Sequence, residues 1–396
     1  MNRKNTPKLR FKEFEKADPW EQRKFPEFVE FYNGLTYTPG DVQESGTLVL
    51  RSSNVKNGEI ADADNVYVNP EIATSENVRK GDIIVVVRNG SRALIGKHAE
   101  IKESMPNTVI GAFMTGIRSE HSSFVNALLG TAQFEKEIEK NMGATINQIT
   151  GYMFSKMEFM IPGDEEQEAI GKYFKEFDNL ITLHQRKYEK LKKVKNAYLD
   201  EMFPKNGERF PKRRFPGFTD PWEQRKLQEV ANKVTEKNTD FGVQETFTNS
   251  AEFGVIRKRD FFEHDISNAD NIGGYYVVRN EDFVYNPRIS ATAPVGPVNR
   301  NKLDRNGVMS PLYTVFRTHD IDNTYLEWFF KSRYWHSFMF FNGDSGARSD
   351  RFSIKDAVFF EMPIPVPDIE EQKLIGIFLD HLDNLITLHQ RKYHNY

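Results

Sequence analysis

Two stretches of the chain carry apolar residues in alternating steps of four and three, with a histidine at one of these positions in each. This spacing is typical of a helix with a coiled-coil seam. Neither proline nor glycine interrupts residues 172–203, and the second stretch is shorter than the first. At about 1.5 Å per residue, the two helices are roughly 50–55 Å and roughly 40 Å long. The predicted seam residues are Ile170, Phe174, Phe177, Ile181, His184, Tyr188, Leu191 and Tyr198, and then Ile375, Leu379, Leu382, Ile386, His389 and Tyr393.

The sequence between these stretches alternates short apolar runs with turn residues, which predicts strands joined by turns. In the first such region we expect strands at residues 47–51, 82–87 and 109–117, a hairpin turn at Asn57-Gly58 and a helix at 122–140. In the second we expect strands at 274–279, 283–286 and 312–317, and an aromatic-rich helix at 323–341. We interpret those aromatic residues as core rather than as a surface for stacking bases. Both regions are therefore predicted to be α+β.

The chain is an internal repeat. Residues 178–188 and residues 383–393 both read DNLITLHQRKY, and residues 18–24 (DPWEQRK) return as residues 220–226. Between these matching blocks the two halves share only a skeleton, such as Asp82 opposite Asp282 and Arg88 opposite Arg288. Two modules of different specificity on one common frame explain this sharp separation better than a simple structural duplication does.

These patterns predict an α+β chain in which two divergent modules are separated by long helices. We expect the two helices to form an antiparallel coiled coil, with a module at each end and a pseudo-two-fold internal repeat. The predicted segments are 1–24 (N-terminal segment), 25–163 (first module), 164–205 (central helix), 206–226 (repeat of the N-terminal segment), 227–366 (second module) and 367–396 (last helix).

Composition narrows the class of protein. The 396 residues include 28% charged side chains and no cysteine, which excludes disulfides and cysteine-based catalysis or zinc binding. No apolar run approaches the ~18 residues of a membrane helix, and no signal core follows the N-terminus, so we expect a cytoplasmic protein without membrane contact. The net charge is −3, whereas a free-standing DNA-binding domain usually has a pI above ~9. The charge therefore counts against a DNA-binding protein that acts alone.

Polar residues in the predicted loops are the candidates for contact with DNA bases. Arginine suits guanine in the major groove, and asparagine and glutamine suit adenine. For any single residue, simple solvation remains the alternative. The run 186–195 is strongly basic, and it is either a solvated helix face or a contact to phosphates. The candidates are Arg51, Ser53, Asn54, Arg88, Asn89, Ser91, Arg92, Thr145, Asn147 and Gln148 in the first module, and Arg257, Lys258, Arg259, Asn286, Arg288, Arg348, Ser349 and Arg351 in the second.

With these residues in view, the chain resembles the specificity (HsdS-like) subunits of type I restriction-modification systems over nearly its full length. The resemblance rests on the order of module and helix, on residues 81–84 with 90–91 and 95–97, on residues 282–286, and on Pro162 and Pro365 before Glu-Gln pairs. It implies a non-catalytic subunit that binds double-stranded DNA at a bipartite, asymmetric target. It also implies two methyltransferase subunits and two motor-nuclease subunits as partners, which bind S-adenosylmethionine, ATP and magnesium.

Other chemistry finds little support in the sequence. Asp18-Pro19-Trp20 and its copy lack the second proline of an adenine-methyltransferase motif, and the glycines near Lys97 have the wrong spacing for a phosphate-binding loop. The acidic run near Pro367 mimics a nuclease site, but Glu168 replaces the lysine in the other repeat. We therefore predict no catalytic and no metal-binding residues, and we interpret His184 and His389 as interface residues. An orphan DNA-binding regulator, a coiled-coil scaffold and an enzyme remain as rival classes.

Overall fold

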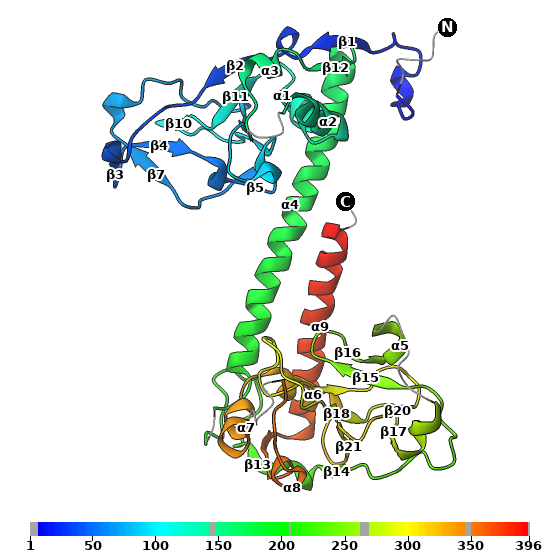
Figure 1. Cartoon of the computed structure of the whole chain (residues 1–396). Helices are drawn as coiled ribbons and strands as arrows, with labels where there is room; N and C mark the ends of the chain where they lie inside the picture. Colours follow the sequence, from blue (N-terminus) through cyan, green and yellow to red (C-terminus); the bar gives the residue numbers. More distant parts are fainter. Residues whose placement is uncertain (1–6, 143–146, 206, 262–268, 345–349, 395–396) are drawn as a thin grey trace. The chain divides into compact units, whose positions relative to one another are not determined.

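The computed structural model describes residues 7–142, 147–205, 207–261, 269–344 and 350–394 (Figure 1). The described part of the chain divides into two compact units, with the boundary between Leu183 and His184. Each unit contains a four-stranded antiparallel sheet, with the order β2-β11-β8-β9 in the first and β14-β21-β18-β19 in the second. Because corresponding strands occupy corresponding places, the predicted α+β class and internal repeat are confirmed.

The first unit adds a second four-stranded sheet, in the order β10-β4-β7-β3, in which β10 runs parallel to β4. Its core gathers side chains from the β2-β11-β8-β9 sheet and from three short helices. Two short antiparallel pairs, β1 with β12 and β5 with β6, complete the unit. The strands are β1 (Glu21–Lys24), β2 (Glu30–Asn33), β3 (Val42–Gln43), β4 (Thr47–Leu50), β5 (Val55–Lys56), β6 (Glu59–Ile60), β7 (Val66–Val68), β8 (Ile83–Val86), β9 (His98–Glu100), β10 (Thr108–Ile110), β11 (Met114–Arg118) and β12 (Glu158–Ile161), and the helices are α1 (Ser122–Leu129), α2 (Ala132–Asn141) and α3 (Gly151–Phe154).

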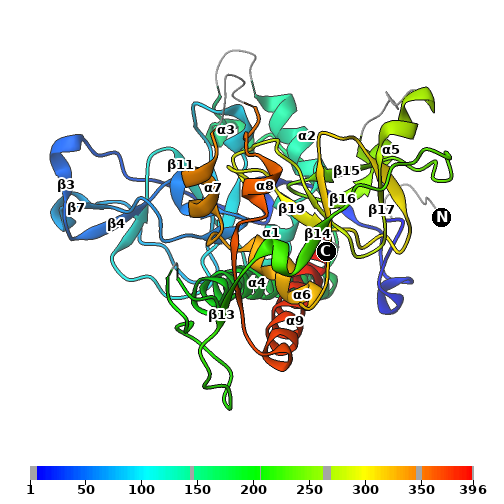
Figure 2. The same ribbon diagram turned by 90° about the horizontal axis from the view of Figure 1, so that it is seen from below.

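The second unit pairs its four-stranded sheet with three two-stranded ones, β15 with β16, β17 with β20 and β13 with β22. Figure 2 shows α6 lying against α9, and all four aromatic side chains of α6 are buried. The strands are β13 (Glu223–Lys226), β14 (Ala231–Lys233), β15 (Phe247–Ser250), β16 (Gly254–Arg257), β17 (Tyr276–Val278), β18 (Phe283–Tyr285), β19 (Val298–Arg300), β20 (Gly307–Met309), β21 (Thr314–Thr318) and β22 (Pro363–Val366), and the short helices are α5 (Lys258–Phe261), α6 (Asn323–Lys331), α7 (His336–Asn342) and α8 (Asp356–Phe359).

Three predicted elements are each divided in two. The strand expected at 109–117 becomes β10 and β11, which belong to different sheets and are joined by a turn at Gly111–Phe113. The helix expected at 122–140 breaks after Leu129 because the Thr131 hydroxyl accepts a hydrogen bond from the Phe134 amide and so begins a new helix. The helix expected at 323–341 likewise divides into α6 and α7.

The two long helices are α4 (Asp164–Glu201) and α9 (Ile369–His394). Within the second unit they pair in antiparallel fashion, as residue numbers rise on one helix while they fall on the other. His184 Nδ1 lies 2.8 Å from His389 Nδ1, Lys195 Nζ lies 2.6 Å from Asp383 Oδ1, and the rings of Tyr198 and Phe378 are 4.7 Å apart. The expected antiparallel coiled coil is thus present in this unit.

Several predicted seam residues lie in the core, others are half-buried, and one is exposed. Ile375, Leu379, Leu382 and Ile386 are buried, while Leu191 and Tyr198 pack on the core of the second unit. Ile170, Phe177, Ile181, His184, Tyr188 and His389 are half-buried, and the side chain of Tyr393 lies outside the described residues. The prediction was wrong for Phe174, which is 48% exposed. The α4 face that packs on the first unit includes Gly171 and Lys175, and Phe174 is turned away from Lys175 by about 100°.

A buried ion pair joins the repeated segments to the long helices. Arg10 donates to both oxygens of Glu166 at the start of α4, at 2.8 and 2.7 Å, and Arg214 binds Glu371 of α9 at 2.7 and 2.8 Å. Glu166 is 2% exposed and Glu371 is fully buried. Each carboxylate therefore needs its arginine, which explains why residues so far apart in the chain recur together in both halves.

Candidate nucleic-acid interface

Three predicted loops of the first module meet at one place. Arg88 forms a backbone bridge with Gln148, and the neighbouring Ile149 amide donates to the Val87 carbonyl at 2.8 Å. The Asn89 side chain donates to the Ser52 hydroxyl at 3.0 Å, which brings in the third loop. The loops that follow β4 and β8 are therefore joined to the segment that follows α2, in a single polar surface.

The second module repeats this bridge with a different side chain. Arg288 pairs with Arg351 as Arg88 pairs with Gln148, and the Phe352 amide donates to the Pro287 carbonyl at 2.8 Å. Both arginines follow equivalent strands, β8 and β18, at the same offset from a buried aspartate, Asp82 or Asp282. The arginine is thus common to the two modules, whereas its partner changes from glutamine to arginine.

Ion pairs hold the strand ends that lie away from the bridging loops. Arg118 of β11 binds Asp82 at 3.0 Å, and Arg317 of β21 binds Asp282 at 2.7 Å. Burial raises the pKa of Tyr32, as does its hydrogen bond to Asp82. Asp282 accepts two hydrogen bonds from Arg317. Both aspartates precede their strands whereas the bridge follows them, so these ion pairs fix the end of the sheet opposite the bridge.

In the structure some candidates are exposed cations, and others are side chains that hydrogen-bond within the loops. Arg88, Arg92 and Arg288 are exposed, Arg351 is half-buried, and within the described ranges none of the four pairs with a carboxylate. Ser91 and Gln148 accompany them at the surface or partly buried. An unpaired arginine at a loop needs no broken ion pair before it binds a base or a phosphate, so these four are the strongest candidates.

The asparagine candidates hold the loops instead. Asn54 is fully buried and its amide donates to the Ala63 carbonyl at 2.8 Å, so the structure corrects its assignment as a base-reading residue. The Ser53 hydroxyl is buried as well. Asn89 binds Ser52 and accepts from the Ser91 amide, while Asn147 donates to the Gly90 carbonyl. In the second module Asn286 donates to the Asn249 carbonyl at 2.7 Å.

Other basic candidates already have acidic partners. Arg51 binds the Asp64 carboxylate at 2.8 Å. Arg257 binds Asp260 at 2.8 Å, and Arg257 and Arg259 both lie within 3.8 Å of Glu245. Lys258 is half-buried beside them at the start of α5. Contact with DNA would have to displace these carboxylates. Thr145, Arg348 and Ser349 lie outside the described residues.

The sequence reasoning missed several exposed apolar side chains, one of which lies beside Arg88 of the bridge. Phe113 is 54% exposed, and the Arg88 guanidinium lies 4.9 Å from the centre of its ring. Leu312, at the matching turn of the second module, is 58% exposed. Phe341 of α7 is 89% exposed, although most of the aromatic residues around it are core. Their position at turns and helix ends was the only signal, and the periodicity of α6 and α7 obscured it.

Comparison with known proteins identifies the family. A family model described as the type I restriction modification DNA specificity domain matches residues 17–193 and again residues 219–395. The chain belongs to this family. The assignment confirms the resemblance noted from the sequence, and the two matched ranges correspond to two copies of the specificity domain. Among described residues, no helix is long and apolar enough to cross a membrane.

Family members with similar sequences or folds cover this chain to different extents. The specificity subunit of the type I restriction enzyme MjaVIII from Methanocaldococcus jannaschii is 23% identical over 95% of this chain and 88% of its own length. The EcoKI specificity subunit from Escherichia coli is 27% identical over 31% of this chain and 27% of its own length. The crystal structure of the S subunit from M. genitalium shares the fold with a TM-score of 0.59 at 13% identity, covering 98% of this chain and 95% of that one.

Proposed function

We propose that this specificity subunit reads a bipartite DNA target, with one half-site for each module, and that its long helices set the distance between the half-sites. The observation that carries the proposal is the repeated bridge, Arg88 with Gln148 and Arg288 with Arg351. Two different half-sites require a shared backbone arrangement in which one side chain differs, and the bridge has this property. Glutamine matches adenine and arginine matches guanine in the major groove.

The common arginines have a different role in this proposal. Because Arg88 and Arg288 occupy the same place in both modules, they do not distinguish the half-sites. We assign them to backbone phosphates, which fix the register of a protein on the duplex without reading its sequence. Gln148 and Arg351 then approach the base edges beside those phosphates.

The helices also offer matching faces to partner proteins. Leu180 and Leu183 of α4 are 42% and 45% exposed, and their copies Leu385 and Leu388 of α9 are 43% and 46% exposed. Exposed leucines that recur in an identical motif support two equivalent docking faces, one for each of two methyltransferase subunits. Two motor-nuclease subunits complete the proposed assembly, and these partners bind S-adenosylmethionine, ATP and magnesium.

The test uses the chain assembled with its methyltransferase subunits and a set of duplexes that carry single substitutions in either half-site. We expect Gln148→Ala to relax base discrimination in one half-site and Arg351→Ala in the other. Each lost base contact should cost ~1–3 kcal/mol, or about 5- to 150-fold in binding of the preferred sequence. Arg213→Ala is the matched control, because Arg213 lies outside both modules and binds Glu201.

Three outcomes decide between the possibilities. A loss confined to one half-site in each variant supports base reading by these residues. An equal loss on every duplex would make them phosphate contacts. If both variants kept full discrimination, the bridge would not be the reading element. The subunit without methyltransferase partners should show no methyl transfer.

A further inference from the structure

The two long helices carry the same motif but present opposite charges just before it. Residues 178–188 and 383–393 are identical, yet the residue three positions upstream is Lys175 in α4 and Asp380 in α9. Both residues face a recognition module. Lys175 Nζ lies 3.0 Å from Glu100 Oε1, and Asp380 accepts a hydrogen bond of 2.8 Å from the Trp328 indole nitrogen. The helices thus offer a cation to the first module and an anion to the second.

The two modules also carry opposite charges at equivalent positions. Glu100 of β9 pairs with Ile83 of β8, and Arg300 of β19 pairs with Phe283 of β18, so the two residues occupy equivalent positions in the two sheets. The side chain of Glu100 is 6% exposed and that of Arg300 is 8% exposed. A buried carboxylate in the first module therefore stands where the second has a buried guanidinium.

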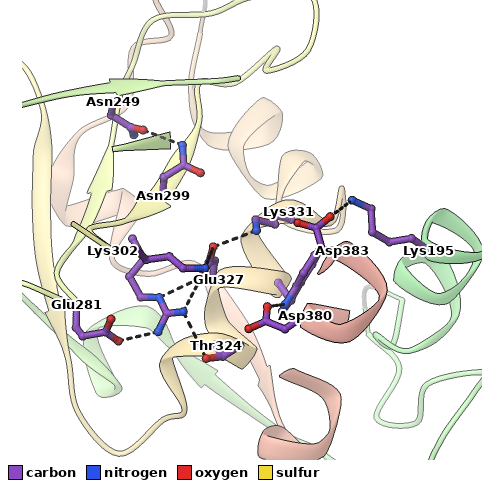
Figure 3. Close-up of polar contacts among 12 residues, drawn as sticks. Lys195, Asn249, Glu281, Asn299, Lys302, Thr324, Glu327, Lys331, Asp380 and Asp383 are labelled. Carbon is purple, nitrogen blue, oxygen red and sulfur yellow. Dashed lines mark hydrogen bonds and ion pairs between the residues drawn. The ribbon is translucent and has the colours of Figure 1, made fainter. Parts of the chain in front are cut away.

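In the second module Arg300 pairs with residues of its own module, and a different hydrogen-bond donor contacts the helix. Arg300 binds Glu327 of α6 at 2.7 Å, and Lys302 and Lys331 lie 3.1 and 3.0 Å from the same carboxylate (Figure 3). Lys331 also lies 4.2 Å from the ring centre of Trp328. The surface that meets Asp380 is therefore an indole N–H beside an ammonium group.

Exchanging the helices would break both junctions. Glu100 beside Asp380 would be a buried carboxylate that faces a like charge, with Lys175 no longer present. Trp328, which is 1% exposed, would turn its N–H toward the Lys175 ammonium, which offers no acceptor. A buried charge or donor that loses its partner is strongly unfavourable, so each module fits its own helix and not the other.

We propose that these two junctions, Glu100–Lys175 and Trp328–Asp380, determine which helix carries which module. The order of the two half-sites in the target then follows from the order of the junctions. This inference rests on the proposed function, because it concerns the modules as readers of half-sites. Asp383 strengthens the second junction by binding Lys195 of α4, which itself lies 5.7 Å from the ring centre of Trp328.

The first experiment transplants a module. A chimera in which residues 25–160 replace residues 227–363 is assembled with the methyltransferase subunits and tested on a duplex that carries the first half-site twice. We expect at least ~tenfold slower methylation than with the unmodified chain on its own target, and recovery to within about threefold when D380K is added. In the unmodified chain, D380K should slow methylation at least ~tenfold. E370K is the matched control, because Glu370 is exposed and makes the same charge change on α9.

A charge-reversal cycle in the unmodified chain decides the question if the chimera does not fold. E100K and K175E should each lower methylation of the native target at least ~tenfold, and the double variant should recover most of the loss. The proposal is refuted if the chimera methylates its target equally well with and without D380K, or if the double variant methylates no better than the single variants. Failure of the unmodified chain to direct methylation to any bipartite target would instead refute the proposed function.

Discussion

Inserting four residues between Leu183 and His184 should lengthen the unread spacer of the target by about two base pairs and leave both half-sites unchanged. Helix α4 runs without a break from Asp164 to Glu201, and the boundary between the two compact units falls at this peptide bond. A Glu-Ala-Ala-Lys insert continues the helix because all four residues favour it. It therefore moves one unit along and around a single helix axis, whatever their starting arrangement.

The size of the effect follows from two helical geometries. Four residues add about 6 Å and turn the far end by about 400°, which is about 40° beyond a full turn. Two base pairs add ~7 Å and turn the duplex by ~70° in the same right-handed sense. With the axes parallel, the remaining error is about 1 Å and about 30°, which a small change in DNA twist absorbs.

A seven-residue insert at the same point is the matched comparison. It adds about 10.5 Å, close to three base pairs, but it turns the far end about 20° short of two full turns. Three base pairs turn the duplex by ~105°, so the module would be about 125° out of phase with its groove. We expect this variant to lose methylation at every spacer length, although its added length is close to a whole number of base pairs.

The assay is methylation by the assembled complex on a duplex library whose spacers differ by single base pairs. The four-residue variant should shift the preferred spacer by one or two base pairs. An unchanged spacer with full activity would refute the reasoning and show that partner subunits place the modules. An insert after Lys190 is a further control, because it falls between His184 and Lys195 and disrupts their pairing with α9.

Three further predictions concern stability. Gly171→Ala should destabilise the first unit by ~1–3 kcal/mol in thermal unfolding, because the added methyl would lie 2.6 Å from a backbone nitrogen of α1. Gly376→Ala should cost less, because the nearest atoms, of Thr324, lie at 3.1 Å and the nearest backbone nitrogen lies at 3.3 Å; equal effects would contradict this. Arg214→Met leaves the buried carboxylate of Glu371 without its counter-ion, although the Trp222 indole N–H still donates to it. The change should cost ~3–5 kcal/mol in denaturant unfolding, most of which the added Glu371→Gln change should recover. Burial lowers the pKa of His389, as do the nearby histidine and lysines. The stability of the helix pair should therefore fall as the pH drops below about 6.5. His389→Leu should flatten this pH dependence, and an unchanged dependence would mean that the hydrogen bond between the two histidine rings contributes nothing.

The long helices and the repeat could be predicted because their signals are local in sequence. A step of three and four is visible wherever one face is buried, and identical blocks need no structural knowledge. The Phe174 error has the opposite origin. Its spacing matches the seam, but the first module packs on a neighbouring face of α4 that includes Gly171 and Lys175, and single-sequence periodicity does not say which protein surface a helix meets.

The candidate DNA surface was predictable by residue type and only partly by role. Loops rich in arginine and amide side chains were found, and the bridge between residues 88 and 148 shows that they meet. The sequence did not distinguish Asn54, which is buried as a brace, from Gln148, which is only half-buried. That difference depends on which backbone carbonyls come within reach after folding. Phe113 escaped notice for the same reason, since its exposure depends on the turn between β10 and β11.

The short strand pairs at the neck of each module have an evolutionary consequence. Lys24 lies opposite Glu158 in the pairing of β1 with β12, and Lys226 lies opposite Pro363 in the pairing of β13 with β22. Cross-strand neighbours of this kind are only about 4.5–5.5 Å apart, so each module leaves the common frame and returns to it at nearly one point. Recombination within the repeated coding blocks on either side would therefore replace a whole module in frame and leave the frame's own contacts intact, so that new pairs of half-sites arise by exchange rather than by gradual mutation.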